Sequence, residues 1–446
     1  MRIEIICTGD EVLTGKTVNT NYSHISRKLE EVGLSVRWGT TVGDDRDTLL
    51  EAFHVAAERA DAVIVNGGLG PTVDDLSQEM AARAAGVNLV LNEYWLERIE
   101  VLFRRHQLVM QPNNRKQALL PATAQIIDNP IGTACGFELT IGRARFFFTP
   151  GVPKELFLML EAELIPRLLA RSGTTAVSRV KRFHSFGLGE SHVDSLLEGI
   201  TDLPPGGEVK LGFQSHFPQL ETKLALRGSD AAQLARTMAP VEAEVRKRLG
   251  HFLVAEDDET LEGLILRDLK GKGASLSVVE TFTGGRIAAR LAQQPDADAV
   301  FCRGLVALAG SEIEAWLQLR DGSLTGGPLT EDALRDAARA ALRATHSSYA
   351  LVALADPASH ADPASHAAPA ARSPALWFAV ATGDHVAVRS SQLRRFGDQE
   401  FLRAGAVELG LDSLRRFLRG LPVEEKTILA KRLADGVHAA ARAVGL

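Results

Sequence analysis

Short apolar runs and amphipathic segments alternate through the first 170 residues of the chain. The apolar runs have the length of strands and cover residues 3–7, 34–41, 62–66 and 145–149. Apolar positions at helical spacing lie between and after them, in residues 25–32, 47–60, 75–85 and 154–169. This alternation predicts a mainly parallel sheet with helices on both faces.

The pattern changes near residue 176. Residues 176–255 predict a small α+β unit, with strands at 209–214 and 221–227 and helices at 191–200 and 230–249. A third domain is predicted over residues 258–446, and it begins with a helix at 260–270 and a strand at 275–279.

One stretch of this third domain has low complexity. The hexapeptide Asp-Pro-Ala-Ser-His-Ala occurs twice in succession, at 356–361 and 362–367, within residues 355–375. A segment so rich in Pro, Ala and Ser cannot bury a core, so it predicts an extended surface loop. Its two histidines fit an expanded loop better than a metal site.

The composition is that of a globular protein, with 45% hydrophobic residues, 24% charged residues and a formal net charge of −6. This charge gives no overall basic field, which argues against nucleic acid and anionic membranes as partners. Cys7, Cys135 and Cys302 lie far apart, as expected of reduced thiols. Neither a signal peptide nor a membrane-spanning apolar run occurs. We therefore expect a cytoplasmic protein whose partners are small molecules or further copies of itself.

The strongest local signal is residues 66–75, Asn-Gly-Gly-Leu-Gly-Pro-Thr-Val-Asp-Asp, which follow a predicted strand and lead into a predicted helix. Glycines in such a loop allow backbone N–H groups to converge on an anion, and the helix N-terminus adds partial positive charge. Open α/β sheets bind ligands at this end of their strands. In the alternative interpretation the glycines form only a tight turn, and Asp74 and Asp75 are charges at a helix start.

Two further loops with carboxylates follow predicted strands. Asp10 and Glu11 follow the first strand, and Asp44 and Asp45 follow the second. Together with the glycine-rich loop they are expected to converge at one edge of the sheet. Carboxylates beside an anion site make sense where a divalent cation bridges them to phosphate oxygens, because they would otherwise repel the phosphate. Each aspartate by itself has a simpler explanation as a turn residue or helix cap.

These motifs resemble the amino-terminal domain of the CinA family, and they occur in the family's order. The matching segments are residues 8–13 (Thr-Gly-Asp-Glu-Val-Leu), 19–21 (Asn-Thr-Asn), 41–44 (Thr-Val-Gly-Asp), 66–75, 112–118 (Pro-Asn-Asn-Arg-Lys-Gln-Ala), 129–134 (Asn-Pro-Ile-Gly-Thr-Ala) and 148–153 (Phe-Thr-Pro-Gly-Val-Pro). Residues 186–191 (Phe-Gly-Leu-Gly-Glu-Ser) are similar to the family's middle domain. The resemblance covers essentially the whole chain.

The resemblance implies an α/β protein with a three-layer, molybdopterin-binding-like domain over residues 1–170, a KH-like α+β domain over 176–255 and a CinA-type α/β domain over 258–446. The first domain would cleave ADP-ribose to AMP and ribose 5-phosphate with Mg²⁺, Mn²⁺ or Co²⁺, with K⁺ as a further candidate ion. A homodimer is also expected from the resemblance.

The resemblance further implies roles for individual residues of the first domain. The catalytic carboxylates would be Asp10, Asp44, Asp74 and Asp75, and the first three of these would also be metal ligands. The phosphate would lie against Gly67, Gly68, Gly70 and Thr72. The rest of the ligand would be held by Asn19, Asn21, Asn113, Arg115 and Lys116.

The last domain resembles the family's nicotinamide mononucleotide deamidase but departs from it at the reacting groups. The family's nucleophile loop reads Glu-Ser-Cys-Thr-Gly-Gly, whereas residues 280–285 read Glu-Thr-Phe-Thr-Gly-Gly, so Thr281 replaces the serine. Leu308 stands for the family's tyrosine and Ile313 for its lysine. What persists is Thr283, Gly284 and Gly285, and further on Phe396-Gly397-Asp398 with Leu402-Arg403. The β-methyl group of threonine crowds attack, so we expect a degenerate site without deamidase activity.

Three functions compete for the first domain. The leading one is metal-dependent hydrolysis of the pyrophosphate of ADP-ribose or a related nucleotide. The second is a non-catalytic protein that binds or senses molybdopterin or a nucleotide. The clustered aspartates favour metal chemistry, since a pure anion site gains nothing from their repulsion. An inert scaffold for a dimer is the weakest, because the polar loops are intact.

Overall fold

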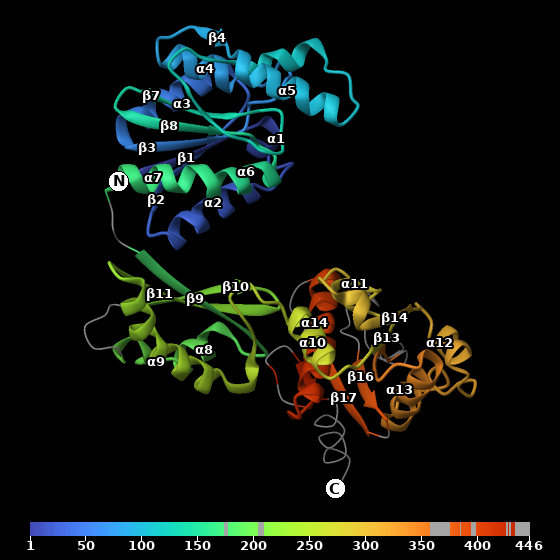
Figure 1. Cartoon of the computed structure of the whole chain (residues 1–446). Helices are drawn as coiled ribbons and strands as arrows, with labels where there is room; N and C mark the ends of the chain where they lie inside the picture. Colours follow the sequence, from blue (N-terminus) through green and yellow to red (C-terminus); the bar gives the residue numbers. More distant parts are fainter. Residues whose placement is uncertain are drawn as a thin grey trace, which may run out of the picture. The chain divides into compact units, whose positions relative to one another are not determined.

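A computed structural model describes residues 1–173, 177–203, 209–356, 375–383, 385–393, 398–424, 427 and 430–432 (Figure 1). The chain forms two compact units: Met1–Arg179 with Arg227–Ala235, and Val180–Leu226 with Arg236–Leu446. Residues 357–374 of the expected surface loop, and also Phe396 and Gly397, lie outside the described residues. None of the described helices is long and apolar enough to span a membrane.

The first unit is built on a six-stranded sheet in the order β2-β1-β3-β8-β7-β6. Its strands are β1 (Ile3–Thr8), β2 (Val36–Val42), β3 (Ala62–Asn66), β6 (Gln125–Ile127), β7 (Gly136–Ile141) and β8 (Ala144–Thr149). The first four in this order run parallel, and β7 and β6 add an antiparallel edge. The predicted mainly parallel sheet is therefore confirmed. Every residue of β1 and β3 is buried, as expected for central parallel strands covered on both faces.

Helices cover both faces of this sheet and complete the predicted three layers (Figure 1). One face packs against α2 (Thr20–Glu31), α6 (Pro153–Met159) and α7 (Ile165–Ser172). The other packs against α3 (Arg46–Arg59), α4 (Ser77–Ala84) and α5 (Glu93–Arg105). A short α1 (Asp10–Leu13), a 3₁₀ helix (Pro112–Ala118) and a two-stranded antiparallel sheet of β4 (Leu89–Leu91) and β5 (Leu119–Pro121) complete the domain.

The helix predicted over residues 154–169 contains a π turn, Leu160–Leu164, between α6 and α7. Pro166 follows this turn and lacks the backbone N–H that a regular helix would use. A locally widened turn accommodates such a residue while Leu160 and Leu164 stay buried in the core.

The middle domain contains a four-stranded sheet in the order β10-β11-β9-β12, in which the β10–β11 and β9–β12 pairs are antiparallel. Its elements are β9 (Val177–Phe186), α8 (Glu190–Leu196), β10 (Lys210–His216), β11 (Gln219–Gly228), α9 (Ala231–Leu249) and β12 (Leu253–Glu256). The sequence indicated β10, β11 and both helices but missed β9 and β12. Most positions of β9 are only half-buried, so its sequence lacks a clear apolar run.

The carboxy-terminal domain has a six-stranded sheet in the order β14-β13-β15-β16-β17-β18. The strands are β13 (Leu276–Glu280), β14 (Phe301–Val306), β15 (Tyr349–Ala355), β16 (Ala375–Thr382), β17 (His385–Leu393) and β18 (Ala430–Arg432). The helices are α10 (Leu261–Gly271), α11 (Arg286–Ala292), α12 (Gly310–Leu317), α13 (Glu331–Thr345) and α14 (Gln399–Leu418). Separate apolar clusters lie on the two faces, so this domain is also layered α/β.

Candidate functional site

A cavity of about 420 Å³ lies at the carboxyl ends of the four parallel strands of the first domain. The loops after β1, β2, β3 and β8 all contribute to its lining. The predicted convergence of the carboxylate loops and the glycine-rich loop at one sheet edge is thus observed. Among the predicted site residues, those that line the cavity are Asp44, Asp74, Asp75, Gly67, Gly68 and Gly70.

The glycine-rich loop depends on backbone conformations that favour glycine. Gly67 and Gly68 have φ angles of 114° and 68°. A Cβ atom on Gly67 would lie 2.6 Å from Thr8 Oγ1, and one on Gly68 would lie 2.5 Å from Ser77 Oγ. Thr8 is almost fully buried, and its hydroxyl oxygen has no hydrogen-bond partner among the described residues. The loop therefore brings bare backbone and an unpaired hydroxyl together beside the cavity.

Buried amides connect the strand ends beneath this loop. The Asn66 side chain donates to the Pro150 carbonyl at 2.7 Å and to the Thr149 hydroxyl at 3.1 Å. Asn21 donates to Asn66 Oδ1 at 2.9 Å and to the Gly151 carbonyl at 2.7 Å. The amide nitrogen of Asn21 thus has a structural role, and Asn21 does not line the cavity. Its Oδ1 is buried without a hydrogen-bond partner among the described residues, and its predicted ligand contact stays a prediction.

Asp10 and Asp44 hold two of the loops together. Each carboxylate accepts the backbone N–H of the other residue at 3.1 Å. Burial raises the pKa of Asp44, the backbone N–H of Asp10 lowers it, and the charges of Asp10, Glu11 and Asp74 raise it further. Asp44 lies at the edge of the cavity, whereas Asp10 is not among the lining residues.

Asp74 and Asp75 lie in a turn before helix α4 and not in the helix itself. Helix α4 begins at Ser77, two residues later than predicted, so Asp75 is not in its first turn. Asp75 Oδ2 instead accepts from the Thr72 N–H at 2.8 Å and from the Thr72 hydroxyl at 2.5 Å. The pKa of Asp74 is lowered, first by hydrogen bonding to the Thr72 side chain and then by hydrogen bonding to the backbone N–H of Asp74 itself. The positive charge of Lys116 lowers it further. A helix does follow this loop as predicted, although it begins two residues later, and its first residue, Ser77, donates to the Gly67 and Gly68 carbonyls.

The remaining predicted ligand residues do not line the cavity. Asn19 caps α2 by accepting the Tyr22 N–H at 3.0 Å, and Lys116 donates to the Thr72 carbonyl. Thr72 itself is occupied by Asp75 and does not line the cavity. Asn113 and Arg115 are exposed on the 3₁₀ helix.

Five polar lining residues were not among the residues given a predicted role: Thr8, Glu11, Gln117, Thr133 and Glu155. Glu11 belongs to a carboxylate loop that the sequence had already indicated. Gln117 lies inside the matched segment 112–118, and Glu155 lies two residues beyond the segment 148–153, so both had a sequence signal. Glu155 accepts from Asn129 Nδ2 at 2.8 Å, and burial raises its pKa. No charged residue contributes to this shift, which distinguishes Glu155 from the carboxylates around Asp44.

The described residues do not form a ready-made metal centre, since no group of three or more His, Cys, Asp or Glu among them is placed to hold an ion. The lining carboxylates nevertheless have the right chemistry, because hard divalent cations prefer oxygen ligands. Burial is the main cause of the raised pKa of Asp44, and repulsion by the charges of Asp10, Glu11 and Asp74 raises this pKa further. A cation would relieve this repulsion, but it would have to draw the side chains together.

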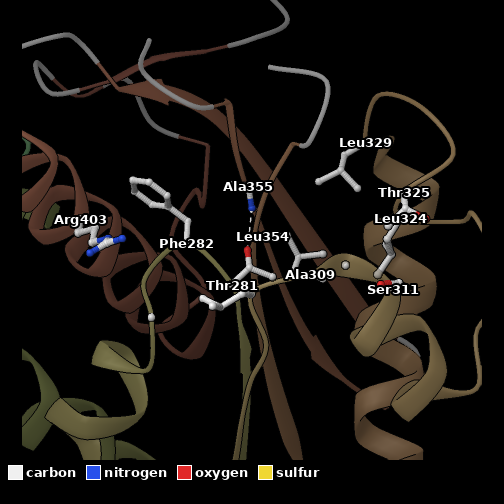
Figure 2. A pocket seen from close by; sticks show the side chains of 13 residues that line it. Thr281, Phe282, Ala309, Ser311, Leu324, Thr325, Leu329, Leu354, Ala355 and Arg403 are labelled. Atoms are coloured by element: carbon white, nitrogen blue, oxygen red, sulfur yellow. Dashed lines mark hydrogen bonds between the residues drawn. The ribbon is translucent and has the colours of Figure 1, made fainter. Parts of the chain in front are cut away.

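A second cavity, of about 460 Å³, lies in the carboxy-terminal domain (Figure 2). Thr281, Gly284, Leu308 and Arg403 line it, as expected for the degenerate site. Three other residues of that predicted set do not line it. Thr283 donates to the buried Glu280 at 2.5 Å, Gly285 caps α11 with a φ angle of 87°, and Ile313 is buried in the core. Glu280 also accepts the N–H groups of Ile287 and Ala288, so it fixes the start of α11.

Three family models match consecutive parts of the chain. They are a probable molybdopterin binding domain at residues 4–170, the KH domain of damage-inducible protein CinA at 180–255 and the CinA C-terminal domain at 258–418. A CinA-like protein from Shewanella sediminis is 36% identical over 424 residues, which cover 94% of this chain and 96% of the relative. The chain belongs to the CinA-like protein family. Its architecture of a molybdopterin-binding-type domain, a KH-like domain and a CinA carboxy-terminal domain is confirmed.

Other CinA relatives match less of the chain. A CinA-like protein from Geotalea uraniireducens is 39% identical over 306 residues, 69% of this chain and 72% of the relative. A solved structure of the protein CinA with unknown function from Thermoplasma acidophilum is 36% identical. It covers 37% of this chain and 96% of its own, with a TM-score of 0.34.

Thr281, which aligns with the nucleophilic serine of the CinA deamidases, has a hydroxyl that already takes part in a hydrogen bond within the fold. Thr281 Oγ1 accepts the Ala355 N–H at 3.1 Å, as drawn in Figure 2. Of the two family groups expected to activate a nucleophile, one position is Leu308, which is 92% exposed at the rim, and the other is the buried Ile313. Among the described residues that line this cavity there is no histidine, lysine or carboxylate to act as a base.

Proposed function

We propose that the amino-terminal domain is a hydrolase that uses a divalent cation to cleave the pyrophosphate of ADP-ribose or a related nucleotide. The observation that supports this most is the composition of one cavity. Glu11 and Asp44, from two strand-end loops, line the cavity together with Asp74 and the positive-φ glycines of the glycine-rich loop. Its volume of about 420 Å³ lies within the range of small-molecule sites.

The lining residues would divide the chemistry between them. The backbone N–H group of Gly68 and the unpaired Thr8 hydroxyl would hold phosphate oxygens. The Gly67 N–H already donates to the Thr149 carbonyl at 2.9 Å, so Gly67 would contribute close backbone approach and no donor. One of the lining carboxylates, Asp44, Asp74 or Asp75, would orient or deprotonate the attacking water. A divalent cation held by Asp10, Asp44 and Asp74, with K⁺ as a further candidate ion, would supply charge neutralisation and Lewis acidity.

The second candidate is a protein that binds molybdopterin or a nucleotide without hydrolysing it. Two observations favour it: the described residues hold no preformed metal-binding group, and Asp10 and Asp44 are engaged with backbone N–H groups. Both candidates use the same glycine loop, so only a reaction assay separates them. The homodimer and the cytoplasmic location remain proposals, as does a small-molecule nucleotide partner.

The test is AMP release from ADP-ribose by the full-length protein with Mg²⁺, Mn²⁺ or Co²⁺, with and without K⁺. Asp44→Asn and Asp74→Asn should each lower the rate by about a hundredfold or more. Asp47→Asn is the matched control, because Asp47 is exposed on α3 outside the cavity. Binding of ADP-ribose without AMP release would support the second candidate, and full activity in both variants would place the reaction elsewhere.

We also propose that the carboxy-terminal domain does not deamidate nicotinamide mononucleotide. The Thr281 hydroxyl is a crowded nucleophile and already accepts a hydrogen bond from the Ala355 N–H. The described residues that line the cavity include no base. Ammonia release from the mononucleotide by the wild-type protein, lost in Thr281→Val, would overturn this proposal.

A further inference from the structure

The two sides of the carboxy-terminal cavity differ in chemistry: one carries an aromatic ring and a guanidinium group, and the other carries aliphatic side chains (Figure 2). Phe282 and Arg403 lie on one side, and Leu324 and Leu329 lie on the other. Leu354, Ala355, Ala309 and the rim residue Leu308 add further apolar surface. Its volume of about 460 Å³ is within the range of cavities that hold small organic ligands.

Arg403 is the one charged side chain among the described residues that line this cavity. Its guanidinium carbon lies 5.9 Å from the centre of the Phe282 ring. Its Nε is buried and has no hydrogen-bond partner within the described part of the chain. The nearby carboxylate of Glu400 is occupied by Arg286, which donates to it with both terminal nitrogens. Glu400 is therefore paired with Arg286, and the Nε of Arg403 has no carboxylate partner among the described residues.

The other polar groups of the lining offer little to a sugar. The Thr281 hydroxyl accepts the Ala355 N–H at 3.1 Å, and the Thr325 hydroxyl donates to the buried Glu314 at 3.1 Å. Ser311 is the remaining hydroxyl among the described lining residues. A ribose enclosed here would leave hydroxyl groups without partners, and unpaired polar groups strongly disfavour binding.

We propose that this cavity binds, without converting it, a small monoanion with an apolar body, such as an aromatic carboxylate. The carboxylate forms a bidentate pair with the Arg403 guanidinium, whose planar fork matches it. The apolar body lies between Phe282 and the leucine side chains. This binding site is independent of hydrolysis in the amino-terminal domain.

The test is calorimetric titration of the full-length protein with 1-naphthoate, with neutral 1-naphthamide and with nicotinamide mononucleotide. We expect naphthoate to bind one per chain, and naphthamide about ten- to a hundredfold more weakly, because a charge-assisted pair is lost. Arg403→Gln should weaken naphthoate binding by a similar factor. Arg303→Gln is the matched control, since Arg303 is exposed on β14 and does not line the cavity.

A second variant tests the apolar side of the cavity. Ala309→Leu fills space while it leaves Arg403 in place, so it should weaken the binding of both naphthyl compounds. Unfolding temperatures of all variants, measured in parallel, show whether the fold is kept. The proposal is overturned if naphthoate does not bind, if acid and amide bind equally, if Arg403→Gln has no effect, or if only the mononucleotide binds.

Discussion

Replacing Gly68 with alanine tests whether close backbone packing holds the glycine loop in place. Gly68 has a φ angle of 68°, and a Cβ atom there would lie 2.5 Å from Ser77 Oγ and 3.2 Å from Thr8 Oγ1. The Ser77 hydroxyl donates to the Gly67 carbonyl at 2.8 Å in a buried position. To make room for a methyl group, Ser77 would have to turn away and break this hydrogen bond.

The cost has two parts. A non-glycine residue in the left-handed region loses about 1 kcal/mol. Breaking a buried hydrogen bond costs about 1–3 kcal/mol more, so Gly68→Ala should lower the free energy of unfolding by about 2–4 kcal/mol. Gly86 is a matched control, because it has a φ angle of 66° but a Cβ atom there would meet nothing within 4 Å. Gly86→Ala should therefore cost only about 1 kcal/mol.

Urea unfolding of the full-length variants, followed by hydrogen exchange of the β3 amides, measures both values in the correct domain. ADP-ribose titration should show weaker binding for Gly68→Ala and unchanged binding for Gly86→Ala. Equal losses of stability in the two variants would refute the packing argument, since they would mean that Ser77 moves aside at no cost.

Two further predictions concern ion pairs. Hydrogen bonding to Arg246 lowers the pKa of Glu256 from 4.5 to about 2. Burial acts in the opposite direction, and hydrogen bonding to Lys181 lowers the pKa further. Its ionised form therefore stabilises the fold above about pH 4.5, and this contribution disappears as the pH falls towards 2. In urea titrations at pH 7, Glu256→Gln should lower the free energy of unfolding by about 1–2 kcal/mol, a value that already allows for the partial exposure of Glu256. This loss should become progressively smaller at lower pH. A loss that does not change with pH would contradict the prediction. Arg290 donates to the buried carboxylates of Glu408, at 2.7 Å, and Glu262. Arg290→Met leaves both without their cation, so thermal unfolding should show a free energy of unfolding lower by about 3–5 kcal/mol. A loss below about 1 kcal/mol would show that the two carboxyl groups become protonated without cost.

Much of the fold was predictable because its central strands are apolar runs of strand length. Strand β3 has the predicted bounds, and β1, β2 and β8 differ by no more than two residues at either end. Strands β9 and β12 were missed, since half-buried positions and a short length leave little periodic signal. The metal ions and the roles of individual aspartates stay predictions.

The candidate sites show where local sequence stops being informative. The motifs correctly indicated that Asp44, Asp74 and the glycine loop meet at one edge of the sheet. They did not indicate that Asn21 bonds to Asn66 beneath that loop. An asparagine in a loop motif fits a ligand contact and a structural bond equally well, and only the neighbouring backbone distinguishes them.

The sequence by itself determined the element types, the family and the changes at the deamidase centre, because each depends on residue identity and spacing along the chain. The tertiary structure decided which side chains reach a cavity. Glu155 and Gln117 line the first cavity with Asp44, and Phe282 lines the second with Leu324 and Leu329, although long stretches of sequence separate them. The direction of a side chain in a loop depends on contacts between strands distant in sequence, and no local pattern records those contacts.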